Sequence, residues 1–120
     1  MKTNKQIVAS WVAAFNKNDI GSLMNLYAEG ATHVSPHAKK SGLKGGLVPA
    51  NKLQNFWAGA LNNAKKEKLH FKLNQATVSS RYGGDVKFSY THKPWGEENK
   101  TFQNLRLIID EGKILFSQTE

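Results

Sequence analysis

The chain contains no cysteine, few acidic residues and only two arginines, Arg81 and Arg106. The absence of cysteine excludes disulfides, thiolate catalysis and cysteine metal ligands, and it leaves the redox compartment open. Seventeen basic residues against nine acidic ones give a net charge of +8. Specific nucleic-acid recognition usually needs arginine clusters, or aromatic residues interleaved with basic ones on one surface. Because the basic residues are mostly dispersed lysines, we do not expect a nucleic-acid partner; the charge favours an anionic small ligand or simply solubility.

The sequence also lacks an apolar stretch long enough to span a bilayer, so no membrane segment is expected. Lys2 and Lys5, followed by an apolar segment, superficially resemble a secretory signal. However, the apolar residues between Ile7 and Phe15 recur with the period of an amphipathic helix. We therefore expect a cytoplasmic protein. With 120 residues, 39% of them hydrophobic, the chain is expected to form one domain, residues 1–120.

Three helices are predicted in the first half of the chain. Thr3 and Gln6 have the spacing of a capping box, which begins a helix that runs to about Asn16. Asp19 caps a second helix, which Gly30 is placed to end. The apolar face of this second helix comprises Ile20, Leu23, Met24 and Tyr27. A short segment, 31–35, follows and is expected to be closed by Pro36.

The third helix opens near Pro49 and Asn51, and its apolar residues from Leu53 to Ala64 have helical spacing. The remaining sequence alternates between apolar and polar residues, as strands do. The expected strands are 69–74, 86–90, 102–109 and 114–117. Helices followed by a strand meander predict an α+β fold, in which three N-terminal helices pack on one face of a curved antiparallel sheet.

Both faces of the predicted strand 102–109 carry apolar residues. One face comprises Phe102, Asn104, Arg106 and Ile108, and the other comprises Leu105, Leu107 and Ile109. An antiparallel sheet with one face in water shows a cleaner separation of apolar and polar residues. If the helices cover one face, a second copy of the chain is the natural cover for the other. We therefore expect a homodimer through the sheet.

Several segments together resemble the nuclear transport factor 2-like superfamily, which includes ketosteroid isomerases, SnoaL-like polyketide cyclases and scytalone dehydratase. They are the run from Trp11 to Asp19, the run from Leu26 to Thr32, the following Pro36, and the later helix with Phe56 and Trp57. The resemblance covers nearly the whole chain. It implies a cystatin-like cone, a curved sheet wrapped around a long helix with a pocket at its open end, and frequent dimers. It does not specify a function.

In ketosteroid isomerases, a tyrosine, an aspartate base and a protonated aspartic acid perform the reaction. The resemblance places Trp11, Ser35 and Asn104 at these three positions. A serine without a partner cannot abstract a carbon-bound proton at neutral pH, so isomerisation by that mechanism is not expected. The acidic residues all fall at helix ends, strand starts, turns or the terminus in this interpretation. Paired-carboxylate catalysis therefore has no candidate.

His33 is the best remaining candidate for catalysis, because it shares a strand face with Ser35 and the resemblance makes that face the pocket. A histidine of near-neutral pKa can act as general acid or base, with Asn104 or Arg106 stabilising an oxyanion. The predicted pocket lining comprises Trp11, Phe15, Tyr27, Ser35, His37, Trp57, Phe88, Tyr90, His92 and Arg106. Most of these aromatic residues fit a core as well as a pocket wall. Neither a metal site, for example between His33 and His37, nor a cofactor is predicted.

Three functions therefore remain open. The first is a dimeric pocket that binds a small, largely apolar and in view of Arg106 acidic molecule, without catalysis. The second is a small lyase or isomerase that uses His33 as general base. The third is a protein-assembly module. The scarcity of carboxylates favours the first over the second.

Overall fold

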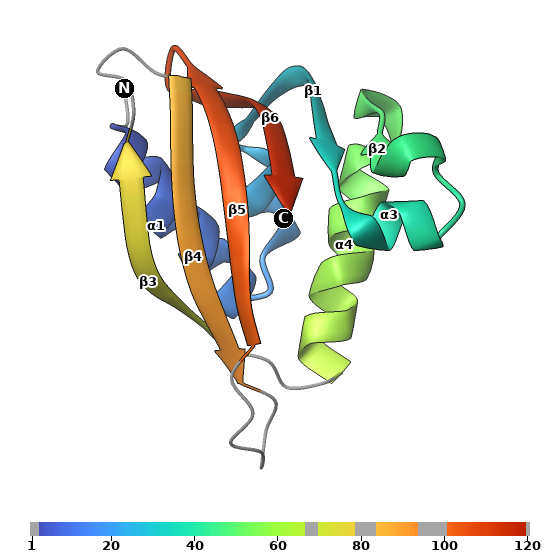
Figure 1. The fold of residues 1–120 in the computed structure, drawn as a ribbon, viewed down its shortest axis with the longest axis horizontal. Helices are drawn as coiled ribbons and strands as arrows, with labels where there is room; N and C mark the ends of the chain where they lie inside the picture. The colour runs from blue at the N-terminus through green and yellow to red at the C-terminus, as the bar shows by residue number, and fades with distance from the viewer. Residues whose placement is uncertain (1–2, 67–69, 79–83, 94–100, 120) are drawn as a thin grey trace.

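The structure, a computed structural model, describes residues 3–66, 70–78, 84–93 and 101–119, and the side chains of 3–66 and 105–119. The helices in this part of the chain are α1 (Asn4–Asn16), α2 (Ile20–Met24), α3 (Pro36–Lys40) and α4 (Ala50–Lys66), with a 3₁₀ turn η1 (Lys44–Gly46) (Figure 1). The strands are β1 (Tyr27–Val34), β2 (Leu47–Val48), β3 (His70–Val78), β4 (Gly84–Lys93), β5 (Thr101–Asp110) and β6 (Lys113–Thr119). No helix among the described residues combines the length and the apolar character needed to cross a bilayer.

The strands form one sheet in the order β2-β1-β6-β5-β4-β3, and its long strands bend along their length (Figure 1). The predicted α+β class is confirmed. The sequence predicts an antiparallel sheet, and all neighbouring strands are antiparallel except β1 and β6, which run parallel. The parallel pair arises because β6, the last strand of the meander, returns beside a strand that precedes α4 in the chain.

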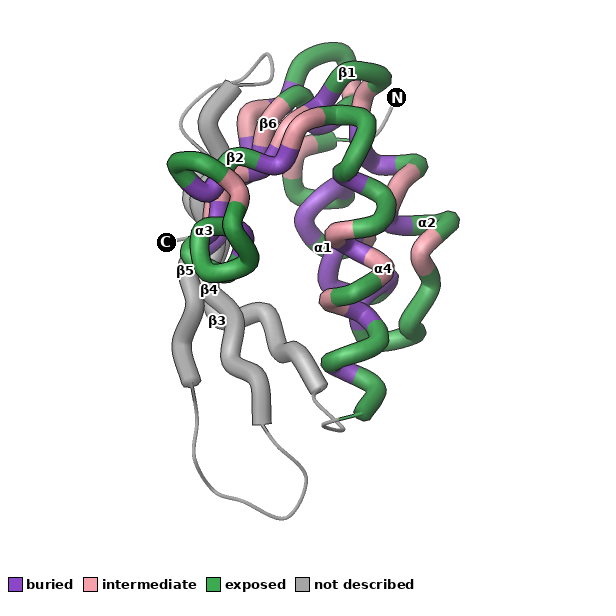
Figure 2. Tube along the Cα trace, turned by 90° about the vertical axis from the view of Figure 1, so that its right-hand side faces the viewer, coloured by how far each residue is buried: buried purple, intermediate pink, exposed green. Residues whose placement is uncertain are grey.

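The helices α1, α2 and α4 lie together on one side of the sheet (Figure 2). Leu105, Leu107 and Ile109 of β5 are buried in the core that these helices share with the sheet. The alternate residues Arg106 and Ile108 are only partly buried, because successive side chains of a strand point to opposite faces. The two faces of β5 thus divide as the sequence predicts.

Helix α1 begins with the predicted capping box. The Thr3 amide donates to the Gln6 side chain at 2.9 Å, and the Gln6 amide donates to the Thr3 hydroxyl at 3.2 Å. These two bonds satisfy backbone donors that a helix start otherwise leaves without partners. The buried residues of α1 are Ile7, Val8, Trp11, Val12, Ala14 and Phe15. The helix therefore supplies two of the aromatic rings at the centre of the core.

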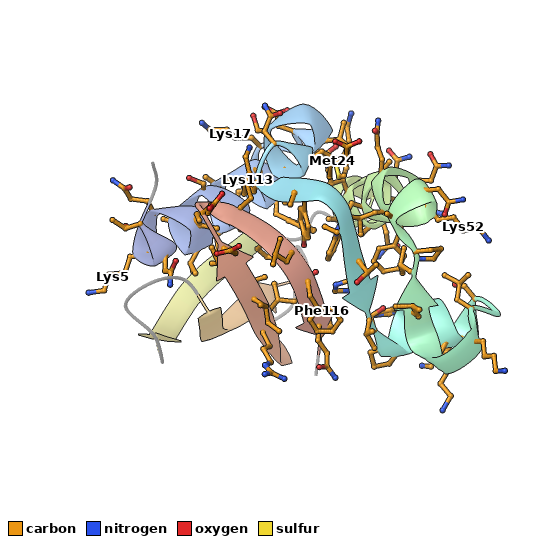
Figure 3. All side chains as sticks on the ribbon, turned by 90° about the horizontal axis from the view of Figure 1, so that it is seen from above. Lys5, Lys17, Met24, Lys52, Lys113 and Phe116 are labelled. Atoms are coloured by element: carbon orange, nitrogen blue, oxygen red, sulfur yellow. The ribbon has the colours of Figure 1, made fainter. Side chains whose placement is uncertain are left out.

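The second helix is shorter than the sequence predicts. It ends at Met24, and Tyr27, which the helical spacing assigns to its apolar face, is the first residue of β1. The Leu26 carbonyl accepts a hydrogen bond from the Ile114 amide at 2.8 Å, so the sheet already holds the chain at this point. Lys113 Nζ also donates to the carbonyl of Asn25, the residue after Met24, and Figure 3 shows Lys113 and Met24 on the same side of the molecule.

The predicted segment 31–35 belongs to this longer strand. Gly30, which the sequence places at a helix end, lies inside β1 with a φ of +82°. The pairing of β1 with β6 is irregular between Tyr27 and Thr32, around that glycine. A glycine at positive φ is typical of such an irregularity, and the same preference makes it a common helix terminator. Gly30 in the sequence is therefore compatible both with a strand irregularity and with the end of a helix.

Pro36 begins a helix, whereas the sequence predicts that it closes a segment. The Ser35 hydroxyl accepts a hydrogen bond from the Ala38 amide at 3.1 Å and so caps α3. Proline is favoured in a first helical turn, since its missing N–H has no helical partner there. After α3, the chain turns back so that the Ser35 amide donates to the Gly46 carbonyl at 3.0 Å.

Gly46 contacts Ser35 so closely that a side chain has no room. A methyl group built on Gly46 would lie 2.5 Å from the Ser35 carbonyl oxygen, whereas one on Gly45 would meet nothing within 4 Å. Both glycines have positive φ, of +74° and +65°. We predict that G45A costs about 1 kcal/mol of stability, from backbone strain alone. G46A should cost roughly 2 kcal/mol more, because the overlap adds to the same strain.

Urea unfolding of both variants measures this difference. Equal losses for G45A and G46A would contradict the close approach of Gly46 to Ser35.

Candidate functional site

β1, β6 and α4 meet around His33, whose side chain is 1% exposed. The parallel register places His33 opposite Ser117 of β6. From the helix side, the Phe56 and Trp57 rings lie with their centroids 5.2 and 4.6 Å from that of the imidazole. The imidazole is therefore enclosed between polar side chains of the sheet and aromatic rings of α4.

Four polar side chains form a continuous series through this region. The Tyr27 and Ser117 hydroxyl oxygens are 2.9 Å apart, and Ser117 Oγ is 2.6 Å from His33 Nδ1. His33 Nε2 is 3.4 Å from Thr119 Oγ1. Tyr27, Ser117 and His33 are buried, whereas Thr119 is half-buried. This series, the Tyr27–Thr119 chain, thus leads from the interior of the core to a partly exposed hydroxyl.

Aromatic rings fill the interior end of the Tyr27–Thr119 chain. Trp11 and Phe15 stack with their centroids 4.3 Å apart, and Trp57 meets Phe15 edge-on at 5.4 Å. The Tyr27 ring lies 6.2 Å from that of Trp57. Such pairs add about 0.5–1.5 kcal/mol each to the free energy of burial. Trp11 and Phe15 are therefore part of the core, and among the described residues of the series Thr119 is the one that is half-buried, as is the nearby Phe56.

The phenol of Tyr27 stays protonated in this environment. Burial raises the pKa of Tyr27 to about 12, while hydrogen bonding from Ser117 and the indoles of Trp11 and Trp57 acts in the opposite direction. Trp57 Nε1 is itself buried and has no hydrogen-bond partner of normal geometry among the described residues.

The imidazole of His33 is neutral at physiological pH. Burial lowers the pKa of His33 to about 3, and hydrogen bonding to the Ser117 backbone acts in the opposite direction. A general base works best when its pKa lies near the working pH. The near-neutral pKa on which a catalytic role of His33 depends is therefore not found here.

No known protein-family profile and no curated protein matches the sequence. Solved structures do resemble this one. A SnoaL-like protein of unknown function from Burkholderia thailandensis superposes with a TM-score of 0.80 at 16% identity, over 97% of this chain and 92% of its own. A protein of ketosteroid isomerase-like fold from Catenulispora acidiphila gives 0.65 at 20% identity, over 99% and 86%. TerC gives 0.75 at 13% identity, over 98% and 89%.

The chain has the NTF2-like fold. The predicted superfamily resemblance is confirmed at the level of the fold, because these neighbours, with others described as NTF2-like and cystatin-like, span almost the whole chain. Identities of 20% or less carry no information about activity, since this fold serves many chemistries.

Within the NTF2-like fold, some predicted site residues come together and others do not. His33, Tyr27 and Trp57 meet at the Tyr27–Thr119 chain, as described above. The Ser35 hydroxyl is used as the cap of α3, and His37 is exposed on that helix. Arg106 pairs in register with Gln118, on the face of β5 opposite to the buried Leu105 and Leu107. The structure therefore does not bring Arg106 or His37 to His33.

The side chains of four further candidates, Phe88, Tyr90, His92 and Asn104, lie outside the described residues. Among the side chains that are described, no group of three or more histidines and carboxylates is placed to hold a metal ion.

Sequence reasoning missed Ser117, Thr119 and Phe56 as site residues. Ser117 and Thr119 are small polar residues at the end of the last strand, where nothing in the sequence separates them from surface positions. Their role depends on β6 lying beside β1, and the parallel pairing was not predicted. The sequence assigns Phe56 to the apolar face of its helix, and helical spacing alone does not predict that its ring lies against the His33 imidazole.

The buried imidazole predicts acid sensitivity. The folded pKa of His33 is about 3 and the ordinary value is 6.5, so only the unfolded chain binds a proton between these values. Stability is fully present above pH 6.5 and falls as the pH drops toward 3, by up to about 1.4 kcal/mol per pH unit. We predict a loss of about 3 kcal/mol from this group between pH 7 and pH 4.

Urea unfolding across this pH range tests the prediction with two matched variants. H33Q should remove most of the pH dependence, whereas H37Q, which changes an exposed histidine four residues away, should keep it. Equal pH dependence in wild type and H33Q would show that the imidazole is not buried as a neutral group.

Proposed function

We propose that this NTF2-like chain binds a small, largely apolar and uncharged molecule without catalysis, at the Thr119 end of the Tyr27–Thr119 chain beside Phe56. The observation that carries the proposal is a buried row of hydrogen-bonding groups that holds no charge and is walled by aromatic rings. Small-molecule sites have this character, with mostly apolar walls and a few placed polar groups.

The distribution of charges supports an uncharged ligand. All lysine and acidic side chains whose burial is described are exposed, so none of them lies in the core around His33. Burying a charged ligand without an opposite charge is strongly unfavourable. Arg106, the residue that favoured an acidic ligand from the sequence, lies on the other face of β5. The proposal therefore keeps the largely apolar ligand expected from the sequence and replaces its acidic character by an uncharged one.

Two structural neighbours agree with a binding role. The Catenulispora acidiphila protein was solved in complex with trimethylamine, and TerC was co-crystallised with polyporic acid. Chains of this fold thus hold small organic molecules. The alternative of a lyase or isomerase has less support, since the lowered pKa of His33 makes the imidazole a weak base.

Self-association is a second candidate function, and one observation favours it. On β6, Leu115 is 43% exposed and adjoins the half-buried Phe116, which pairs with Ile108 on β5. These residues give the outer face of the sheet an apolar area where a second copy could pack, as the sequence analysis expects.

Ligand charge is tested with two probes that share one ring system. We predict that methyl 2-naphthoate, which is uncharged, binds at least roughly tenfold more tightly than the 2-naphthoate anion, because the described residues around His33 offer no cation to the carboxylate. Titrations followed by backbone amide NMR shifts give both affinity and location. Tighter binding of the anion would contradict the proposal.

Location is tested with two phenylalanine variants. F56A should weaken methyl 2-naphthoate roughly tenfold, since it removes a ring that lies against His33. F116A removes an equally large ring from the opposite face of the sheet and should leave the affinity unchanged. An equal loss in both variants, or a loss in F116A alone, would place the ligand elsewhere.

A further inference from the structure

Residues 35–52 form one end of the molecule, which comprises α3, η1, β2 and the start of α4 (Figure 1). This segment, the 35–52 tip, is closed on itself by backbone hydrogen bonds. The Leu43 amide donates to the Ala38 carbonyl at 3.0 Å, and the Ser35 amide donates to the Gly46 carbonyl at 3.0 Å. The Ala38 side chain is fully buried and holds α3 against the rest of the protein. The tip is therefore a fixed part of the fold.

The 35–52 tip carries positive charge without acidic residues of its own. The whole sequence from Gly30 to Lys66 contains no aspartate or glutamate. The four acidic side chains whose burial is described belong to the start of α2, the first half of β1 and the turn between β5 and β6. The lysines of the tip, all of them exposed, are Lys39, Lys40, Lys44 and Lys52. No described carboxylate thus belongs to the tip.

An exposed leucine lies among these lysines. Leu47 is 46% exposed, and the only other large apolar side chain exposed to a similar degree among the described residues is Leu115, at 43%. Leu47 is one of the two residues of β2, and the other, Val48, is completely buried. Because successive side chains of a strand point to opposite faces, the burial of Val48 directs Leu47 toward solvent. Lys44 precedes it by three residues and Lys52 follows it by five.

Cations around an exposed apolar side chain match the surface of an anionic lipid bilayer. Each lysine close to such a surface strengthens binding roughly fivefold, and an apolar side chain can enter the boundary between headgroups and acyl chains. The tip contains no arginine, whose planar fork suits the fixed phosphate geometry of nucleic acids and phosphopeptides. Lysine ammonium groups are point charges, which suit a fluid array of headgroups.

We propose that the 35–52 tip attaches the protein peripherally to bilayers that contain anionic lipids, with its lysines at the headgroups and Leu47 inserted between them. Attachment of this kind requires no membrane-spanning segment. It is also independent of the small-molecule site proposed above, because the tip residues that carry it take no part in the Tyr27–Thr119 chain.

Binding is measured by sedimentation of the protein with vesicles of phosphatidylcholine, prepared with and without phosphatidylserine. We expect the protein to sediment with the vesicles that contain phosphatidylserine and to stay in solution with pure phosphatidylcholine. Added salt should weaken the binding, because it screens exposed charges. Failure to sediment with the phosphatidylserine vesicles at low salt would overturn the proposal.

The role of the lysines is tested with two double variants of equal net charge. K44Q/K52Q removes two charges from the tip and should weaken binding to the phosphatidylserine vesicles roughly twentyfold. K5Q/K17Q removes two exposed lysines that lie on the other side of the molecule from Lys52 (Figure 3), and it should change the affinity by less than about threefold. An equal loss in both variants would show that binding follows net charge alone and would overturn the tip as the site.

The role of the leucine distinguishes a bilayer from other polyanions. L47N should weaken binding to the phosphatidylserine vesicles roughly fivefold, whereas L115N, which changes the other exposed leucine, should bind like the wild-type protein. Both side chains are exposed, so both variants are expected to fold. If K44Q/K52Q loses binding while L47N keeps it, the tip is a purely electrostatic surface, as for an acidic protein or a nucleic acid, and the assignment to a bilayer is wrong.

Discussion

The pairing of β1 with β6 is the contact on which the rest of the site depends. It joins two strands that lie far apart in the sequence, and its parallel register places His33 opposite Ser117. The same pairing brings the Tyr27 hydroxyl to Ser117 and Thr119 to the far side of the imidazole. A shift of one residue would turn each of these side chains to the other face of the sheet. The register of this pair shifts between Tyr27 and Thr32, and Gly30, with its positive φ, lies within that interval.

Burial of these polar groups decides which chemistry is available. An imidazole among aromatic rings and hydroxyls is neutral, and a buried phenol keeps its proton. Two groups that perform acid–base catalysis in other proteins are thereby held in their uncharged forms. They still donate and accept hydrogen bonds, which are stronger inside a protein than in water. This uncharged state is the basis on which we propose recognition of an uncharged molecule rather than proton transfer.

The sequence predicted those features that depend on local periodicity. The capping box of α1, the apolar face of α4 and the two faces of β5 follow from the spacing of residues alone. The start of β1 was mistaken for helix because the apolar spacing from Ile20 continues to Tyr27, while the sheet contact that ends the helix is non-local. His33 was predicted as a site residue, but its neutrality and its partners Ser117 and Thr119 depend on a strand pairing with no local signal.

The most direct test of this account is a crystal structure of the protein with methyl 2-naphthoate bound. The account predicts that the naphthalene ring lies beside Phe56, with Ser117 and Thr119 within hydrogen-bond distance of His33. A ligand on the outer face of β5 and β6 would contradict it.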